Sequence, residues 1–151
     1  MKRKKRILAV GSAGGHWVQL MRMAPAFSHH DVLWLSTQSG LSEKIPCGRF
    51  GAVRDASMWD KPGLLIMGMQ VLLWVVRQRP DVVISTGAAP GFFAVMFGRV
   101  MGARTIWVDS IANAEELSLA GRKAKRWSHH WLTQWPELAR SDGPHFIGAV
   151  L

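Results

Sequence analysis

The segment ILAVGSAGGHWVQL, residues 7–20, joins a short apolar run to a glycine-rich turn and then to a second, mostly apolar run. The continuous apolar character of residues 7–10 is typical of a strand buried on both faces. Glycines interrupt the chain at residues 11, 14 and 15, and residues 16–27 read as a helix with few polar positions. A strand, a tight turn and a helix in this order are the opening unit of an α/β fold.

The same alternation recurs along the chain. Asp60 can cap a helix that has Pro62 in its first turn and that Pro80 stops. Because helices that connect successive strands produce a parallel sheet covered on both faces, we expect one Rossmann-like α/β domain over residues 1–151, with 1–6 as a basic tail. The further predicted strands are residues 31–37, 50–54, 81–86, 104–108, 130–134 and 145–150, and the further predicted helices are residues 60–79, 92–101 and 120–128.

Composition fits one folded domain. The chain has 151 residues, of which 48% are hydrophobic and 19% charged, so it is too apolar to be disordered. Cys47 is the only cysteine, which rules out an intrachain disulfide, and no secretory signal is recognised at the N-terminus. We therefore expect a cytoplasmic location.

The positive charge is concentrated in two places. Residues 2–6 contribute five cations and residues 122–126 contribute four, together as many as the formal net charge of +9. Such clusters favour an anionic partner, which composition alone leaves open among nucleic acid, a phospholipid surface and a phosphate-bearing substrate. For residues 2–6, a solvated tail is the alternative.

Three segments belong at the carboxyl ends of the predicted strands, where open parallel sheets bind ligands: residues 11–16, 85–91 and 109–110. The glycines of the first segment would let the backbone approach a phosphate closely. The segment lacks the lysine of a P-loop and the spacing of G-x-G-x-x-G, and the second strand ends in Thr37-Gln38 without an acid for a ribose. Dinucleotide binding is therefore disfavoured.

Two side chains in these segments are candidate catalytic groups. His16 lies where the turn meets a helix N-terminus, a position that favours a neutral imidazole able to accept a proton or donate a hydrogen bond; the alternative is a histidine that only caps the helix. Asp109 ends a buried strand, so its carboxylate either reaches the ligand edge or pairs with a cation. Glu115 and Glu116 read as solvated surface.

Two pairs of adjacent histidines, 29–30 and 129–130, resemble metal ligands. Adjacent side chains on a strand or turn rarely point the same way, and no cysteine or acid completes a set, so we expect no metal site.

The stretch LLIMGMQVLLWVV, residues 64–76, is apolar on almost every face of the predicted helix. It spans about 20 Å, less than the roughly 30 Å hydrocarbon layer of a bilayer. Its second face must pack against the domain core, a partner chain or the interfacial zone of a membrane. With basic residues at both ends, we expect membrane contacts from Trp59, Leu64, Leu65, Met69, Leu72 and Trp74.

Four segments in register, GSAGGHWVQL, PDVVISTGAAPG, TIWVDS and HHWLTQWPEL, resemble the PssD/CpsF-type subunits of bacterial exopolysaccharide glycosyltransferases. The same family contains the membrane-anchoring subunit of the eukaryotic UDP-GlcNAc transferase. The resemblance covers nearly the whole chain and implies the N-terminal, acceptor-side half of a GT-B enzyme such as MurG, whose other half is a separate chain.

The resemblance also implies how the site is used. The catalytic partner subunit would bind most of the UDP-sugar donor, no further cofactor would be needed, and this chain would hold a lipid-linked acceptor. His16 is the first candidate for the base and Asp109, where relatives usually carry glutamate, the second. The acceptor or diphosphate would be bound by Gly11, Ser12, Gly14, Gly15, Thr86 and Gly87.

The function expected from these observations is that of a membrane-associated subunit of a two-component, UDP-sugar-dependent glycosyltransferase. It would add a sugar to a lipid-diphosphate-linked acceptor in polysaccharide or lipid-linked oligosaccharide biosynthesis, peripherally on the cytoplasmic face of the inner membrane. One alternative is a non-catalytic adaptor that recruits the partner. A nucleic-acid-binding domain is a second, but the tryptophans lie in apolar runs without interleaved basic residues, so we expect no nucleic acid partner.

Overall fold

The computed structural model describes residues 2–150, so Met1, at the start of the expected basic tail, and Leu151 lie outside the described residues. Its six strands form one parallel sheet in the order β3-β2-β1-β4-β5-β6, the doubly wound order of Rossmann-like folds. The predicted fold class is confirmed. The strands are β1 (Arg6–Gly11), β2 (Asp31–Ser36), β3 (Arg49–Ala52), β4 (Val82–Gly87), β5 (Arg104–Val108) and β6 (His130–Leu132).

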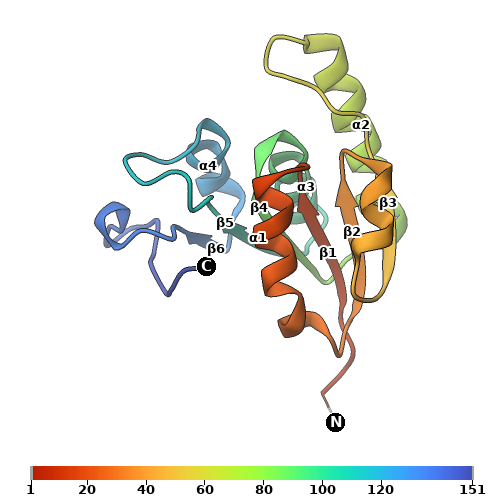
Figure 1. Cartoon of the computed structure of the whole chain (residues 1–151), viewed down its shortest axis with the longest axis horizontal. Coiled ribbons are helices and arrows are strands. Elements are labelled where there is room, and N and C mark those ends of the chain that lie inside the picture. The colour runs from red at the N-terminus through yellow and green to blue at the C-terminus, as the bar shows by residue number, and fades with distance from the viewer. Residues whose placement is uncertain (1, 151) are drawn as a thin grey trace.

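Helices cover both faces of the sheet (Figure 1). Alternate residues of a strand point to opposite faces, so Ala9 of β1 packs with the α1 side chains while Leu8 packs with α2 and α3. The helices are α1 (Gly15–Met23), α2 (Lys61–Gln78), α3 (Ala88–Val100) and α4 (Leu119–Ala124), with short 3₁₀ segments at Ala24–Phe27, Ser39–Lys44, Lys125–Trp127 and Pro136–Leu138.

The longest helix, α2, begins and ends where its sequence signals lie. The Asp60 carboxylate accepts a hydrogen bond from the Gly63 N–H at 3.0 Å, and the helix ends at Gln78, with Arg79 as a left-handed C-cap (φ 44°) before Pro80. One face of α2 packs on the sheet and on α3. Among residues 2–150, no helix combines the length and apolar character needed to cross a membrane.

Three sequence expectations were wrong in detail. The segment 145–150 is not a strand: only an isolated bridge joins His145 to Leu132, and its side chains are largely exposed, so no burial favours pairing. The helix expected over residues 16–27 changes to 3₁₀ geometry at Ala24, next to Pro25. Helix α3 begins at Ala88 rather than residue 92, because Ala88 takes a left-handed conformation that turns the chain directly out of β4.

Candidate functional site

The sheet has its topological switch point between β1 and β4. The chain leaves β1 into α1 on one face and leaves β4 into α3 on the opposite face, and the crevice that doubly wound sheets use for ligands is expected between these two carboxyl ends. The glycine-rich segment 11–16 and the segment 85–91 flank this crevice. Two of the three predicted site segments are therefore neighbours, and the third, residues 109–110, follows β5, which pairs with β4.

Two hydrogen bonds hold His16 against the end of β4. Its Nδ1 lies 3.0 Å from the Thr86 carbonyl oxygen, and the Thr86 hydroxyl donates to the His16 carbonyl at 2.6 Å. Because a carbonyl oxygen can only accept, Nδ1 carries a hydrogen, which leaves Nε2 of the neutral ring with a free lone pair. The half-buried imidazole thus has a fixed tautomer suited to accepting a proton.

Glycine at residue 87 makes this arrangement possible. Gly87 has φ 143°, a conformation that L side chains rarely adopt, and a Cβ there would overlap the His16 ring. Gly11 is also packed closely, since a Cβ would lie 3.0 Å from the Thr86 hydroxyl oxygen. Both glycines are buried, so their role is to let the strand ends and His16 approach each other.

The exposed part of the glycine-rich segment is the N-terminus of α1. Gly14, the N-cap, has φ 89°, and no side chain caps the helix, so no side-chain acceptor occupies the first-turn N–H groups next to exposed Gly15 and half-buried Ser12. Uncapped N–H groups and the positive end of the helix dipole favour an anion there.

Thr86 does not have the position expected of a ligand-binding group. Its side chain is fully buried, and its hydroxyl is used in the bond to the His16 carbonyl. The expectation that Thr86 contacts an acceptor diphosphate is corrected: Thr86 positions His16.

Asp109 lies at the end of β5 as expected, but its carboxylate is 1% exposed and accepts four hydrogen bonds. Both oxygens are fully engaged, so this carboxylate has no free lone pair for a substrate proton. Its donors tie β5 to the loop 110–118; they are Trp107 Nε1 (3.1 Å), Asn113 Nδ2 (3.1 Å), the Ser118 N–H (3.1 Å) and the Ser118 hydroxyl (2.7 Å). This geometry corrects the expectation of Asp109 as a base and makes it a positioning residue.

A buried polar network next to Asp109 was missed by the sequence reasoning. Gln19 of α1 donates to the Ser110 hydroxyl at 3.1 Å, and its amide oxygen accepts from Gln134 at 2.6 Å. Gln134 also accepts from the Val150 N–H at 2.8 Å. The network joins α1 to the loops after β5 and β6 and to the C-terminal segment. A polar Gln19 among apolar neighbours was its only signal in the sequence.

Most of the predicted membrane-contact residues form an exposed apolar surface on α2 and on the preceding loop, called here the α2 surface. Trp59 is 90% exposed, Leu65 67% and Met69 64%, with Leu72 also exposed and Leu64 half-buried. Trp74 instead packs over Gly51 of β3 and belongs to the core side. Exposed residues that the sequence reasoning omitted are Met58, Ile66, Leu73 and Val76.

The remaining polar candidates are dispersed. Glu115 and Glu116 are exposed, and Glu116 forms an ion pair with Arg122 at 3.6 Å. Across residues 2–150, no group of three or more histidine, cysteine or acidic side chains is placed to hold a metal ion.

Comparison with solved structures defines the class of the fold. The chain superposes on MurG of Acinetobacter baumannii with a TM-score of 0.77 at 12% identity, covering 96% of this chain and 45% of MurG. It also superposes on UDP-N-acetylglucosamine 2-epimerase of Rickettsia bellii with a TM-score of 0.69 at 11% identity, covering 89% of this chain and 40% of that protein. The chain has a Rossmann-like α/β fold that spans less than half of each of these proteins, and its structural neighbours include GT-B glycosyltransferases such as MurG.

Two curated proteins are similar in sequence. The UDP-N-acetylglucosamine transferase subunit alg14 of Schizosaccharomyces pombe is 23% identical over 176 residues, covering 97% of this chain and 84% of that protein. The subunit ALG14 of Eremothecium gossypii is 33% identical over 79 residues, covering 48% of this chain and 35% of that protein. No model of a known protein family matches the chain.

Proposed function

We propose that this chain is the acceptor-side subunit of a two-component glycosyltransferase that moves a sugar, N-acetylglucosamine in the first instance, from UDP to a lipid-diphosphate-linked acceptor. The donor class comes from the similarity to UDP-N-acetylglucosamine transferase subunits. The observation that carries the proposal is His16, whose free Nε2 lies beside the uncapped N-terminus of α1 at the switch point.

The chemistry follows from this pair of features. The acceptor hydroxyl must lose a proton as the glycosidic bond forms, and His16 Nε2 takes it. The acceptor's diphosphate binds at the exposed N–H groups around Gly14 and Gly15, where the helix dipole favours negative charge. The UDP leaving group is held by the partner chain, which supplies the opposite wall of the cleft and binds most of the donor.

An apolar cavity of about 270 Å³ beside the site supports a lipid-linked acceptor. It lies between the start of α2, the first turns of α3 and the start of α4, with Met58, Leu64 and Phe92 among its lining residues and Lys123 at its edge. The cavity adjoins the α2 surface at Leu64 and reaches Ala89, in the first turn after β4, so a lipid chain in it would run toward the carboxyl ends of the strands. Peripheral binding through the α2 surface at the cytoplasmic face of the membrane belongs to the same proposal, as does a role in exopolysaccharide or related glycan assembly.

Sugar transfer by the complex of this chain with its partner chain tests the proposal. The assay uses UDP-N-acetylglucosamine and a polyprenyl-diphosphate sugar acceptor in vesicles. His16→Ala should lower kcat at least about a hundredfold, the usual contribution of a general base. The matched control is His29→Ala, an exposed histidine away from the crevice, which should keep wild-type activity. Full activity of His16→Ala would favour an adaptor that only recruits the partner.

A further inference from the structure

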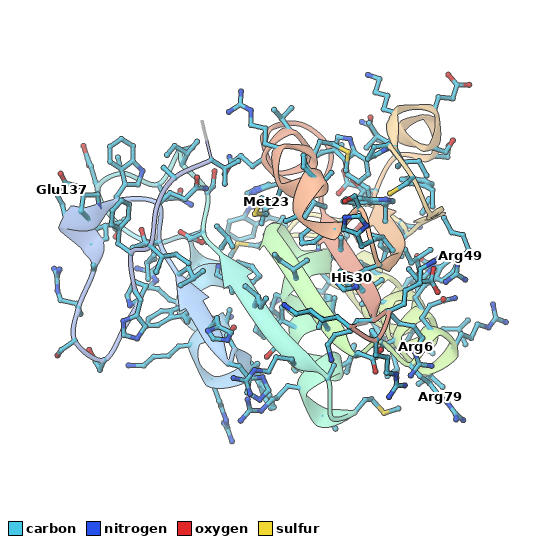
Figure 2. All side chains as sticks on the ribbon, turned by 90° about the horizontal axis from the view of Figure 1, so that it is seen from below. Arg6, Met23, His30, Arg49, Arg79 and Glu137 are labelled. Atoms are coloured by element: carbon cyan, nitrogen blue, oxygen red, sulfur yellow. The ribbon has the colours of Figure 1, made fainter. Side chains whose placement is uncertain are left out.

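The opposite edge of the sheet, at the amino ends of the strands, holds a cavity of about 510 Å³ that the proposed function does not use. Four separate parts of the chain form it: the start of β1, the turn between α2 and β4, the turn between α3 and β5, and the segment before β6. Figure 2, which views the molecule from below, shows Arg6 and Arg79 near each other in this region. The ionisable side chains that line the cavity are Lys5, Arg6, Arg79, Asp81, Arg104 and His129.

The cavity carries excess positive charge. Its one carboxylate, Asp81, already accepts from the Arg6 N–H at 2.8 Å and lies 3.6 Å from the Arg6 guanidinium. Within residues 2–150, Lys5, Arg79 and Arg104 form no ion pair. The C-terminal ends of α2 and α3 also face this edge and together supply about one negative charge. Four lining cations against Asp81 and the two helix ends leave about two positive charges.

His129 adds a hydrogen-bond donor to this wall. Its Nδ1 accepts from the Thr105 N–H at 3.0 Å, so in the neutral ring the hydrogen is on Nε2. Partial burial lowers the pKa of His129, and so do the charges of Arg99, Arg104 and His130. Of these charges, that of Arg104 belongs to the cavity wall.

Arg79 has a backbone conformation that is unfavourable for a residue with a side chain. The left-handed conformation that ends α2 is most readily adopted by glycine or asparagine and is disfavoured for arginine. This conformation ends α2 at the cavity, and the Arg79 guanidinium is one of its lining cations.

We propose that this cavity, called here the amino-edge cavity, binds a phosphate-bearing anion. Arg79 and Arg104 supply guanidinium groups suited to phosphate oxygens, and Lys5 and His129 supply further donors. The phosphate is either free in solution or the headgroup of an anionic lipid. The site is separate from the crevice at the carboxyl edge and does not depend on the proposed transferase function.

Binding by the full chain tests the proposal, with a double variant that removes two lining charges. The variant is Arg79→Asn/Arg104→Gln. Asparagine tolerates the left-handed conformation at residue 79, so folding is expected to be preserved. The control Lys44→Gln/Arg140→Gln removes the same charge from exposed positions outside the cavity. The probes are inorganic pyrophosphate measured by calorimetry, and phosphatidylcholine vesicles with and without phosphatidic acid measured by sedimentation, all at one salt concentration.

We expect the cavity variant to bind at least one probe about tenfold more weakly than wild type while the control changes less than about twofold. Weakened pyrophosphate binding identifies a soluble phosphate, and weakening confined to vesicles with phosphatidic acid identifies a lipid headgroup. The proposal is overturned if wild type binds neither probe, if the cavity variant binds both as wild type does, or if the two variants weaken equally. Should the double variant fail to fold, Arg79→Asn alone is compared with Lys44→Gln by the same criteria.

Discussion

At the scale of single residues, the account depends on how His16 is held. The carbonyl of Thr86 fixes the tautomer of the ring, the hydroxyl of Thr86 fixes the backbone of His16, and the missing side chain of Gly87 leaves space for the imidazole. A base that must accept a proton in one orientation gains from such fixed geometry, because little reorganisation is left for the reaction itself.

Gly87→Ala therefore tests the position of His16 without removing it. The added Cβ would overlap the imidazole, so the ring must move. Alanine at residue 87 would also have to adopt a disfavoured backbone conformation. We expect transfer activity to fall at least about tenfold, because small misplacements of catalytic groups are costly. The matched control is Gly40→Ala, where a Cβ meets no neighbour within 4 Å. Wild-type activity of Gly87→Ala would contradict the assigned geometry.

Asp109 is expected to act on stability and loop position rather than on proton transfer. Asp109→Ala leaves its four donors without their acceptor in a buried place and should lower the free energy of unfolding by about 3 kcal/mol. Chemical denaturation measures this loss, and Glu116→Ala, which removes an exposed carboxylate, should cause little change. A stable Asp109→Ala protein with abolished transfer would instead restore Asp109 as a catalytic group.

At the scale of elements, α2 combines a buried face with an exposed apolar one. Met67, Val71 and Val75 are fully buried, while Leu65 and Met69 on the other face are about two-thirds exposed. In Figure 1, the first part of α2 and the loop before it extend beyond the rest of the chain. An exposed apolar face on a protruding helix is suited to the interfacial zone of a membrane.

Vesicle binding tests the membrane role of α2. Leu65→Ser/Met69→Ser removes exposed apolar area only, so it should weaken binding to vesicles about tenfold or more and leave the melting temperature nearly unchanged. Ile147→Ser, at a 79% exposed position in the C-terminal segment, is the control and should bind as wild type. Equal binding of all three proteins would exclude the α2 surface as the membrane contact.

The sequence predicted the elements well where burial and local signals agreed. The central strands are continuous apolar runs, and α2 has a capping aspartate and a terminating proline, so their positions follow from local patterns. The prediction of a strand at residues 145–150 was wrong because an apolar stretch near a chain end resembles a strand whether or not a neighbouring strand is there to pair with it. The predicted start of α3 was wrong because an alanine side chain does not indicate the left-handed conformation that Ala88 adopts.

At the scale of the whole molecule, the two edges of the sheet have different characters. The carboxyl edge presents helix N-termini, glycines and His16, and the amino edge presents helix C-termini and unpaired cations. Sequence patterns placed residues at the carboxyl edge, since strand ends and the glycine-rich turn are local features. They could not assign Thr86 and Asp109 to positioning roles, because the bonds that occupy these side chains come from segments distant in sequence or from the fold of a loop.

Under the proposed function, the chain supplies only one side of a cleft. Its fold covers less than half of MurG, and in the proposal a second lobe supplies the opposing wall at the carboxyl edge of the sheet. A subunit of the proposed kind should hold its acceptor without completing the reaction, because in this proposal the groups that bind and stabilise the leaving UDP lie on the partner.

The most direct measurement is sugar transfer by the purified chain, alone and after co-expression with the UDP-binding half-transferase of its own genome. With UDP-N-acetylglucosamine and a polyprenyl-diphosphate acceptor in vesicles, we expect no turnover by either chain alone and steady turnover by the pair. Sustained turnover by this chain alone, with no second protein present, would contradict the central claim that it forms half of a divided active site.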